Sequence, residues 1–372
     1  MEYGTTNIQN LHYGLIHVGL PTMVDIDKDN LPNIIDGNVP KNYELCKEGD
    51  IVFADASEDT NEVAKAVEYY NLNGKKVVCG LHTIHGRDNK NKTVVGYKGY
   101  AFSSMSFHHQ IRRIAQGTKI YSINSKNFSE CYVGIPSKDE QQKIADLLRL
   151  IDERIATQNK IIEDLKKLKS AIIENVFDDK HSERLQLDNV GSYIRGLTYS
   201  SNDVVEHGGT LVMRSNNIVN GSLLDYNNNV VFVNKQMSAE QQLQNGDVVI
   251  CMANGSSSLV GKSSFYDGSC HSPITVGAFC GIYRSKEPIV KWLFQTNKYR
   301  RYIWNSLQGG NGAIANLNGE DILNMSFSIP NAPIKDTCVK LLASVDSALE
   351  NNMSLCALYT LQKQHLLRQM FI

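Results

Sequence analysis

The longest regular pattern in the sequence is a series of apolar positions spaced alternately three and four residues apart. It runs through Ile144, Leu148, Ile151, Ile155, Gln158, Ile162, Leu165, Lys169, Ile172 and Val176. This spacing is typical of a helix that packs one seam against another helix. Pro136 and the capping box Ser137-Lys138-Asp139-Glu140 predict its start, and we expect it to reach Phe177. At 1.5 Å per residue, such a helix would be roughly 60 Å long.

The same pattern returns near the C-terminus at an offset of 194 residues. Its positions are Cys338, Leu342, Val345, Leu349, Asn352, Cys356, Tyr359, Lys363, Leu366 and Met370. Gln158 recurs as Asn352, and a polar residue at a seam position costs stability but fixes register. We therefore predict that the two helices pair antiparallel, through Leu148, Ile151, Ile155, Gln158 and Ile162 on one and Leu342, Val345, Leu349, Asn352 and Cys356 on the other. The alternative is two ordinary amphipathic helices, each buried against its own lobe.

The segments before the helices are also repeated. Gly49-Asp50-Ile51-Val52-Phe53 aligns with Gly246-Asp247-Val248-Val249-Ile250 at an offset of 197, without gaps as far as Tyr69 and Tyr266. Each half of the chain is therefore a lobe followed by a helix. Because the second copy, Ser258–Phe265, has the pattern of a strand, we expect a strand over Glu62–Tyr70 as well.

Short β-rich runs alternate with turn-rich segments inside both lobes. We expect strands at Leu15–Val18, Asp50–Ala54, Lys75–Cys79, Leu211–Arg214, Val230–Val233 and Asp247–Met252, loops at Asp88–Lys92, Asn227–Asn229 and Gly309–Gly312, and a helix near Pro288–Ser306. The predicted fold class is α+β, with two mixed, mainly β lobes joined by a long antiparallel two-helix coiled coil and related by a pseudo-two-fold. The predicted domains are residues 1–136 (first lobe), 137–178 (first helix), 179–330 (second lobe) and 331–372 (second helix).

One stretch of the first helix carries a family resemblance. Gly134-Ile135-Pro136-Ser137-Lys138-Asp139-Glu140-Gln141-Gln142-Lys143-Ile144-Ala145-Asp146-Leu147-Leu148, followed by Ile151-Asp152, Leu165-Lys166, Leu168-Lys169 and Phe177, closely resembles the conserved region of the specificity subunits of Type I restriction-modification systems. The Gly246-Asp247 strand, Leu259-Val260-Gly261-Lys262, and the polar segment from Gly309 to Ile329-Pro330 look like that family's target-recognition domains.

The resemblance implies a function for each part. Each lobe would read one half of an asymmetric bipartite site in double-stranded DNA, and the paired helices would act as the ruler between the halves. Two methyltransferase subunits would dock and carry S-adenosylmethionine, and motor-nuclease subunits would join for restriction. Two departures stand out. Only 14 residues precede Leu15, against about 27 before Leu211, so the first strand of lobe one is expected to be missing, and Gln362 replaces Leu168.

Composition sets wider limits. With 372 residues, 42% of them hydrophobic and 21% charged, the chain is expected to form two or more globular domains. We expect it in the cytoplasm and not in a membrane, because it has neither a long apolar run nor a leader-like N-terminus. The eight cysteines form no C-x-x-C pair, which favours reduced thiols. A net charge of −1 means that any DNA contact must come from local basic clusters.

The candidate DNA contacts combine basic and amide side chains. They are Lys65, Arg87, Lys90, Lys92 and Lys98 in lobe one and Asn254, Lys262, Lys298, Arg300, Arg301, Gln308 and Asn311 in lobe two. Arg and Lys can contact guanine edges or phosphates, and Asn and Gln can contact adenine. The alternative is that these are solvated charges or turn formers, and His108–Arg113 could equally be a solvated helix face.

Catalytic and metal-binding patterns are weak. The sequence holds neither an Asn-Pro-Pro-Phe-like tetrapeptide nor a Walker A motif, so we expect no catalysis by this chain and no cofactor bound to it. Cys79, His82 and His85, with His108 and His109 downstream, could be taken for a metal cluster. They lack the paired spacing of zinc sites, so no metal is predicted. A coiled-coil scaffold whose lobes bind proteins, and a metal-dependent nuclease, remain as alternative functions.

Overall fold

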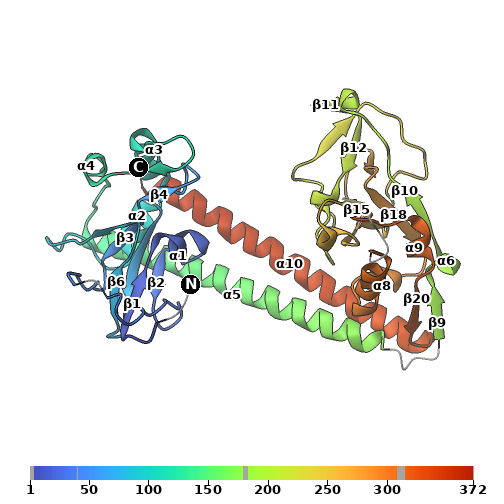
Figure 1. The fold of residues 1–372 in the computed structure, drawn as a ribbon, viewed down its shortest axis with the longest axis horizontal. Coiled ribbons are helices and arrows are strands. Elements are labelled where there is room, and N and C mark those ends of the chain that lie inside the picture. The colour runs from blue at the N-terminus through green and yellow to red at the C-terminus, as the bar shows by residue number, and fades with distance from the viewer. Residues whose placement is uncertain (1–3, 40, 179–182, 308–314, 372) are drawn as a thin grey trace. The chain divides into compact units, whose positions relative to one another are not determined.

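The computed structural model describes residues 4–39, 41–178, 183–307 and 315–371 (Figure 1). The chain forms two compact units, one of residues 1–160 with 353–372 (unit 1) and one of residues 161–352 (unit 2). Helices α5 (Lys138–Val176) and α10 (Ala332–Met370) each contain 39 residues and contribute to both units. Among the residues that the structure describes, no helix combines the length and the apolar character that a membrane crossing needs.

The start of α5 is fixed by the predicted capping box. The Ser137 backbone N–H donates to Glu140 Oε2 at 3.0 Å, and the Ser137 hydroxyl donates to the same atom at 2.7 Å. The Glu140 N–H donates back to Ser137 Oγ at 3.4 Å. Because these bonds satisfy N–H groups that have no partner inside the helix, the helix begins where the sequence predicts.

Unit 1 combines short strands with small helices. Its elements are β1 (Ile8–Leu11), α1 (Tyr13–Val18), β2 (Met23–Asp25), β3 (Ile51–Ala54), β4 (Ala56–Ser57), β5 (Ala66–Asn71), β6 (Lys76–Cys79), β7 (Thr83–Gly86), α2 (Tyr97–Phe102), α3 (Met105–Ile114), β8 (Tyr121–Ser122) and α4 (Ser125–Phe128). The main sheet has the order β2-β5-β3-β7, and β1 pairs with β6 in parallel.

Unit 2 repeats this plan with additions. Its elements are β9 (Glu183–Gln186), α6 (Leu187–Val190), β10 (Gly191–Arg195), η1 (Ser201–Asp203), β11 (Val204–Val205), β12 (Thr210–Met213), η2 (Ser215–Asn217), β13 (Val231–Val233), β14 (Val248–Cys251), β15 (Ala253–Asn254), η3 (Ser257–Leu259), β16 (Ser263–Phe265), β17 (Ile274–Val276), β18 (Cys280–Ser285), α7 (Val290–Leu293), α8 (Asn297–Leu307), β19 (Ala315–Asn316), α9 (Gly319–Leu323) and β20 (Ser326–Ile329). The two four-stranded sheets have the orders β10-β18-β14-β16 and β11-β13-β12-β17.

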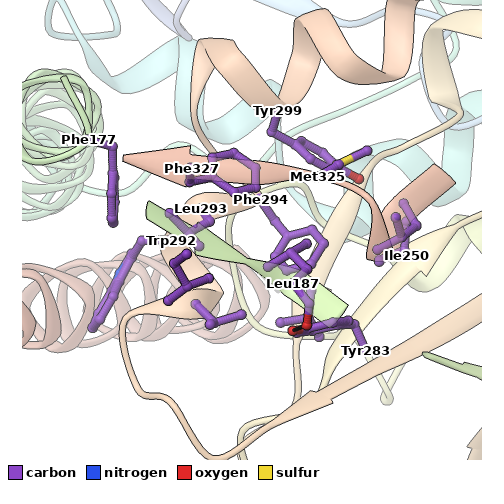
Figure 2. Close-up of a cluster of buried hydrophobic side chains, with 14 of the residues drawn as sticks. Phe177, Leu187, Ile250, Tyr283, Trp292, Leu293, Phe294, Tyr299, Met325 and Phe327 are labelled. Carbon is purple, nitrogen blue, oxygen red and sulfur yellow. Dashed lines mark hydrogen bonds between the residues drawn. The ribbon is translucent and has the colours of Figure 1, made fainter. Parts of the chain in front are cut away.

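The largest core of unit 2 is rich in aromatic side chains. Figure 2 shows Trp292, Phe294, Tyr299 and Phe327 gathered with the aliphatic side chains of Leu187, Ile250 and Leu293. Trp292 is 1% exposed, and burial of such large apolar surfaces is a main source of stability. Ile173 and Leu342 from the long helices belong to the same cluster, so the helix ends are packed into the core of unit 2.

The strand registers show that the duplication is structural. Ile51 faces Glu68 and Gly86 on the two neighbours of β3, and Val248 faces Phe265 and Tyr283 on the two neighbours of β14. Every partner keeps the offset of 197, so the repeat predicted from the sequence is confirmed and extends beyond Tyr69. The copies differ at both edges, because β10 pairs with β18 at one edge, and β2 pairs with β5 at the other whereas the equivalent β16 ends its sheet in the described part of unit 2. In the described part of unit 1, β7 is the last strand of its sheet.

The two long helices contact each other in the antiparallel sense inside each unit. In unit 1, Lys363 Nζ of α10 lies 2.6 Å from Asp152 Oδ1 of α5. In unit 2, Lys169 Nζ of α5 lies 2.7 Å from Asp346 Oδ1 of α10. The two lysines differ by 194 positions, and so do the two aspartates. Each helix therefore gives one lysine and one aspartate to a reciprocal pair of ion pairs.

Three local predictions were wrong. Leu15–Val18 lies in helix α1, because the His12 side chain caps its N-terminus and Gly19, with φ at 138°, ends it. The strands β5 and β16 begin only at Ala66 and Ser263. The chain turns just before them, at Ala64 (φ 58°) and Gly261 (φ 80°).

The helix expected over Pro288–Ser306 is divided into α7 and α8. The Thr296 hydroxyl accepts a hydrogen bond from the Tyr299 N–H at 3.0 Å, which starts a new helix at that point. The predicted loops at Asp88–Lys92 and Asn227–Asn229 are confirmed, and Gly309–Gly312 lies outside the described residues.

Candidate nucleic-acid interface

A groove in unit 2 lies between α8 and the segment that follows β15. Its lining residues from the two sides include Ser257, Lys262, Arg300 and Trp304, and Asn316 of β19 borders it as well. Cations, an indole and an amide side chain thus surround one concave surface. This combination can neutralise phosphates, stack on bases and form hydrogen bonds with base edges.

Buried contacts hold α8 against this groove. The Tyr299 hydroxyl donates to the Gly261 carbonyl at 2.7 Å. Ile303 lies one turn later in α8. A Cβ added at Gly261 would be only 2.7 Å from the Ile303 side chain. With Tyr299 and Ile303 facing inward, Arg300, Arg301 and Trp304 are left on the exposed face. Trp304 is 66% exposed, which is unusual for so large an apolar side chain.

The remaining candidates of lobe two have different settings. Lys262 is half-buried on the groove wall. Asn254 is held in place, because its Nδ2 donates to Ser215 Oγ at 3.3 Å and its Oδ1 accepts from the Ser256 N–H at 3.0 Å. Lys298 is half-buried on α8. Gln308 and Asn311 lie outside the described residues.

Unit 1 carries an equivalent helix. The Ser104 hydroxyl caps α3 by accepting from the Phe107 N–H at 3.3 Å, as Thr296 caps α8, and Phe107 and Ile111 are buried as Tyr299 and Ile303 are. His108, His109 and Arg112 therefore occupy the positions of Arg300, Arg301 and Trp304. Arg112 NH1 donates to Asn61 Oδ1 at 3.3 Å, which joins the helix to the loop after β4. In the sequence analysis, a solvated helix face was an equal alternative for His108–Arg113.

Two basic candidates of lobe one form ion pairs with buried carboxylates. Lys98 is 8% exposed, and its Nζ lies 3.1 Å from Glu68 Oε1 and donates to Thr93 Oγ1 at 2.9 Å. Arg87 forms two hydrogen bonds with Asp50, of 2.9 and 2.6 Å, and also contacts Glu44. Lys98 is therefore buried, and Arg87 is half-buried with its guanidinium held by acids.

The Arg87 pair is part of the repeated scaffold. Arg284 binds Asp247 in unit 2 through the same two bonds, of 2.8 and 2.7 Å. Burial acts to raise the pKa of Asp50, but hydrogen bonds from Arg87, the Lys47 N–H and His85 hold the pKa below its usual value. Since the pair occurs in both lobes, it is best explained as a structural joint.

The other lysines of lobe one lie at the surface. Lys90 and Lys92 are exposed in the loop after β7, and the Asp88 carboxylate orders this loop by accepting from the Lys90 and Thr93 N–H groups at 3.1 and 2.8 Å. Lys65 is partly exposed and forms an ion pair with Glu62 at 2.7 Å. Lys90 and Lys92 thus remain accessible to a ligand.

The possible metal residues are regrouped by the fold. Cys79 and His85 lie together with Cys46, with one ligand atom from each within 4.8 Å of the others. His82 lies beside Asp55 instead, at 3.3 Å. Cys46 is far away in the sequence, so only the strand pairing could bring it to this cluster.

The seam positions of the helices differ in burial. Leu148, Ile151, Gln158, Ile162, Leu342, Val345 and Leu349 are buried, with exposures between 0 and 8%. Ile155, Asn352 and Cys356 are half-buried. In unit 1, Cys356 Sγ donates to Asn159 Oδ1 at 3.3 Å, so this end of the seam is polar.

Sequence comparisons agree on one family. Residues 29–167 match the model described as Type I restriction modification DNA specificity domain. The chain is 33% identical over 177 residues to the Type I restriction enzyme EcoKI specificity subunit of Escherichia coli (strain K12). This alignment covers 42% of this chain and 35% of that protein. Identity to the StySPI specificity subunit of Salmonella potsdam is 33% over 175 residues, with the same coverage. The matches span about a third of the length of these curated relatives.

Structural comparison extends over nearly the whole chain. The crystal structure of a Type-I restriction-modification system S subunit from M. genitalium superposes with a TM-score of 0.57 at 15% identity, covering 98% of this chain and 88% of that one. A chain from a study of complex assembly and conformational transition of the type I R-M system gives a TM-score of 0.53 at 13% identity, covering 96% and 90%. These two show a shared fold, and the resemblance predicted from the sequence is confirmed.

Proposed function

We propose that this chain, whose residues 29–167 match the Type I restriction modification DNA specificity domain, is the DNA-binding specificity subunit of a Type I restriction-modification enzyme. Each lobe would read one half of an asymmetric bipartite site. The observation that carries the proposal is the exposed helix face that both lobes present beside a polar loop, with Arg300, Arg301 and Trp304 in one and His109 and Arg112 in the other. A repeated surface with unequal side chains fits two half-sites of different sequence.

The side chains of the groove suggest a division of labour. Arg300, Arg301 and Lys262 would contact phosphates or guanine edges, and Asn316 an adenine edge. Trp304 would stack on a base or insert at a base step. In lobe one, Lys90 and Lys92 would contact the backbone, whereas Arg87 and Lys98 are excluded by their buried partners.

The domain plan follows from this assignment. Residues 1–136 and 179–330 would be the two target-recognition domains, and the conserved helices at 137–178 and 331–372 would pair as an antiparallel spacer that sets the distance between the half-sites. A helix of this size, at 1.5 Å per residue, measures about 60 Å. The chain itself would catalyse nothing and hold no cofactor, and the bound S-adenosylmethionine would belong to its partners. We expect this work to take place in the cytoplasm.

Partner docking is supported by apolar side chains on the outside of the helices. Leu147 and Leu341 are 40% and 47% exposed, and they are equivalent under the offset of 194. Ile161 and Leu355, also equivalent, are 40% and 38% exposed. Two matching apolar positions on each helix fit the docking of two methyltransferase subunits, and motor-nuclease subunits would join that complex.

The proposal is tested by detecting N6-methyladenine across a genome after co-expression with the methyltransferase subunit in an unmethylated host. We expect a split, asymmetric motif that disappears without this chain. The double variant Arg300→Ala/Trp304→Ala should relax or abolish one half-site, and Arg112→Ala in the matching helix of lobe one should affect the other half only.

Two results would contradict the proposal. One is an intact complex that methylates no new motif. The other is a partner interaction that is insensitive to salt and shows no base preference, which is the behaviour of a scaffold whose lobes bind proteins.

A further inference from the structure

Three side chains of the types that bind metal ions meet inside unit 1. Cys46 precedes β3, Cys79 ends β6, and His85 lies in β7. One ligand atom from each lies within 4.8 Å of the other two, and the two Sγ atoms are 3.5 Å apart. Cys46 is 6% exposed, and Cys79 and His85 are half-buried.

The fold does not require these residue types. Under the offset of 197, the three positions correspond to Leu243, Val276 and Ile282 in unit 2, which are 4%, 0% and 0% exposed in one apolar core. The equivalence is visible in the backbone. The N–H of residue 46 donates to Val77 O at 2.8 Å, and that of residue 243 donates to Ile274 O at 2.9 Å. One lobe thus packs these sites with aliphatic carbon, whereas the other supplies two sulfurs and an imidazole.

The surroundings of the cluster suit a bound cation. His85 Nε2 lies 2.9 Å from Asp50 Oδ2, which leaves Nδ1 for a ligand and provides the carboxylate partner that metal-binding histidines usually have. Glu44 Oε2 lies 4.0 Å from His85 Nδ1.

We propose that Cys46, Cys79 and His85 form a binding site for Zn²⁺ or a similar borderline-soft divalent cation in lobe one. In a tetrahedral zinc site with Zn–S bonds of about 2.3 Å, two sulfurs are separated by roughly 3.8 Å, close to the distance found. A disulfide would need them at about 2.05 Å. Binding releases the two thiol protons, and the fourth position falls to Glu44 or water. The ion would fasten the ends of β6 and β7 to the segment before β3.

The first test is a titration of the full-length, reduced, metal-free chain with Co²⁺, whose thiolate complexes give a charge-transfer absorption band. We expect the band to saturate at one equivalent and to be removed by Zn²⁺. We also expect Zn²⁺ to raise the melting temperature. The triple variant Cys46→Leu/Cys79→Val/His85→Ile, which installs the residues of lobe two, should fold and lose both responses.

Two further variants keep the test independent of folding defects. Cys270→Ser removes a thiol from unit 2 and should leave the band unchanged. Cys79→Val alone should weaken Co²⁺ binding at least ten-fold and lower the intensity of the band. Absence of the band in the wild-type chain, or its persistence in the triple variant, would overturn the proposal. So would a Cys46–Cys79 disulfide whose reduction does not restore metal binding.

Discussion

The ion pair at the unit 2 end of the helices offers a sharp test of the packing. Asp346 is 5% exposed, and its carboxylate contacts Lys169 at 2.7 Å and Lys291 at 3.2 Å. It also accepts from the Trp292 indole N–H at 3.0 Å. Asp346→Asn keeps an acceptor for the indole but leaves the ammonium of Lys169, whose side chain is 7% exposed, without its counter-charge.

The expected loss follows from this burial. Removing one partner of a buried ion pair costs about 3–5 kcal/mol, because the other charge remains desolvated. Since Lys291 is 25% exposed and can turn to solvent, we expect the lower end, about 3 kcal/mol. The control is Asp152→Asn, the repeat-equivalent site. There the side chains of Lys363 and Asp152 are 19% and 29% exposed, so the loss should be only about 1 kcal/mol.

Urea unfolding of the full chain measures both losses. The two tryptophans, Trp292 and Trp304, lie in unit 2, so their fluorescence reports on that unit, whereas circular dichroism follows both. The double change Lys169→Met/Asp346→Asn should recover most of the loss, because it removes both buried charges and keeps an acceptor for the Trp292 indole N–H. The reasoning is refuted if Asp346→Asn costs less than about 1 kcal/mol, or no more than Asp152→Asn.

Three further outcomes are expected. Gly261→Ala should destabilise unit 2 by about 1–2 kcal/mol in urea, because φ at this position is 80° and the new Cβ meets Ile303. Ala64→Gly at the matching site (φ 58°) should instead stabilise unit 1 by up to about 1 kcal/mol. Changes in unfolding free energy of the same sign for both variants would contradict this. Asp50→Asn should cost about 3 kcal/mol at pH 7. Because the folded pKa of Asp50 is lowered, this contribution is present above the ordinary value of about 3.8 and is lost as the pH falls through the lowered folded pKa, so the melting temperatures of variant and wild type should converge in acid and not near pH 9. Cognate duplex DNA should quench the emission of the exposed Trp304, and Trp304→Phe should abolish the quenching; an unchanged spectrum would place the DNA elsewhere.

The sequence predicted the parts of the fold that depend on periodicity. The helix α5 was found from its three-four spacing and its capping box, and the duplication from residues with fixed backbone roles, such as Gly49 and Gly246. The prediction of a strand at Leu15–Val18 was wrong because an apolar run of this length has no distinctive period. The His12 side chain caps the N-terminus of this segment and so favours a helix. The late starts of β5 and β16 depend on the positive φ of Ala64 and Gly261, and an alanine gives no warning of such a turn.

The candidate site was harder to predict, because charge does not reveal burial. Arg87 and Lys98 look like surface cations in the sequence, yet each faces an acid, Asp50 or Glu68, that lies far along the chain. Trp304 was missed although it follows Arg300 by one helical turn, a spacing that places both on one face. Gln308 and Asn311 lie outside the described residues and remain predictions.

The reciprocal ion pairs of the two helices have a consequence for how such chains can diversify. Each pair joins α5 to α10, and neither involves a residue of the exposed faces on α3 or α8. A crossover within the helix segments between related genes that share these lysines and aspartates would therefore exchange a whole lobe and keep the ion pairs of the joint. The paired helices would join different lobes through the same contacts. New combinations of lobes could then arise by recombination without changes in the helix pairing.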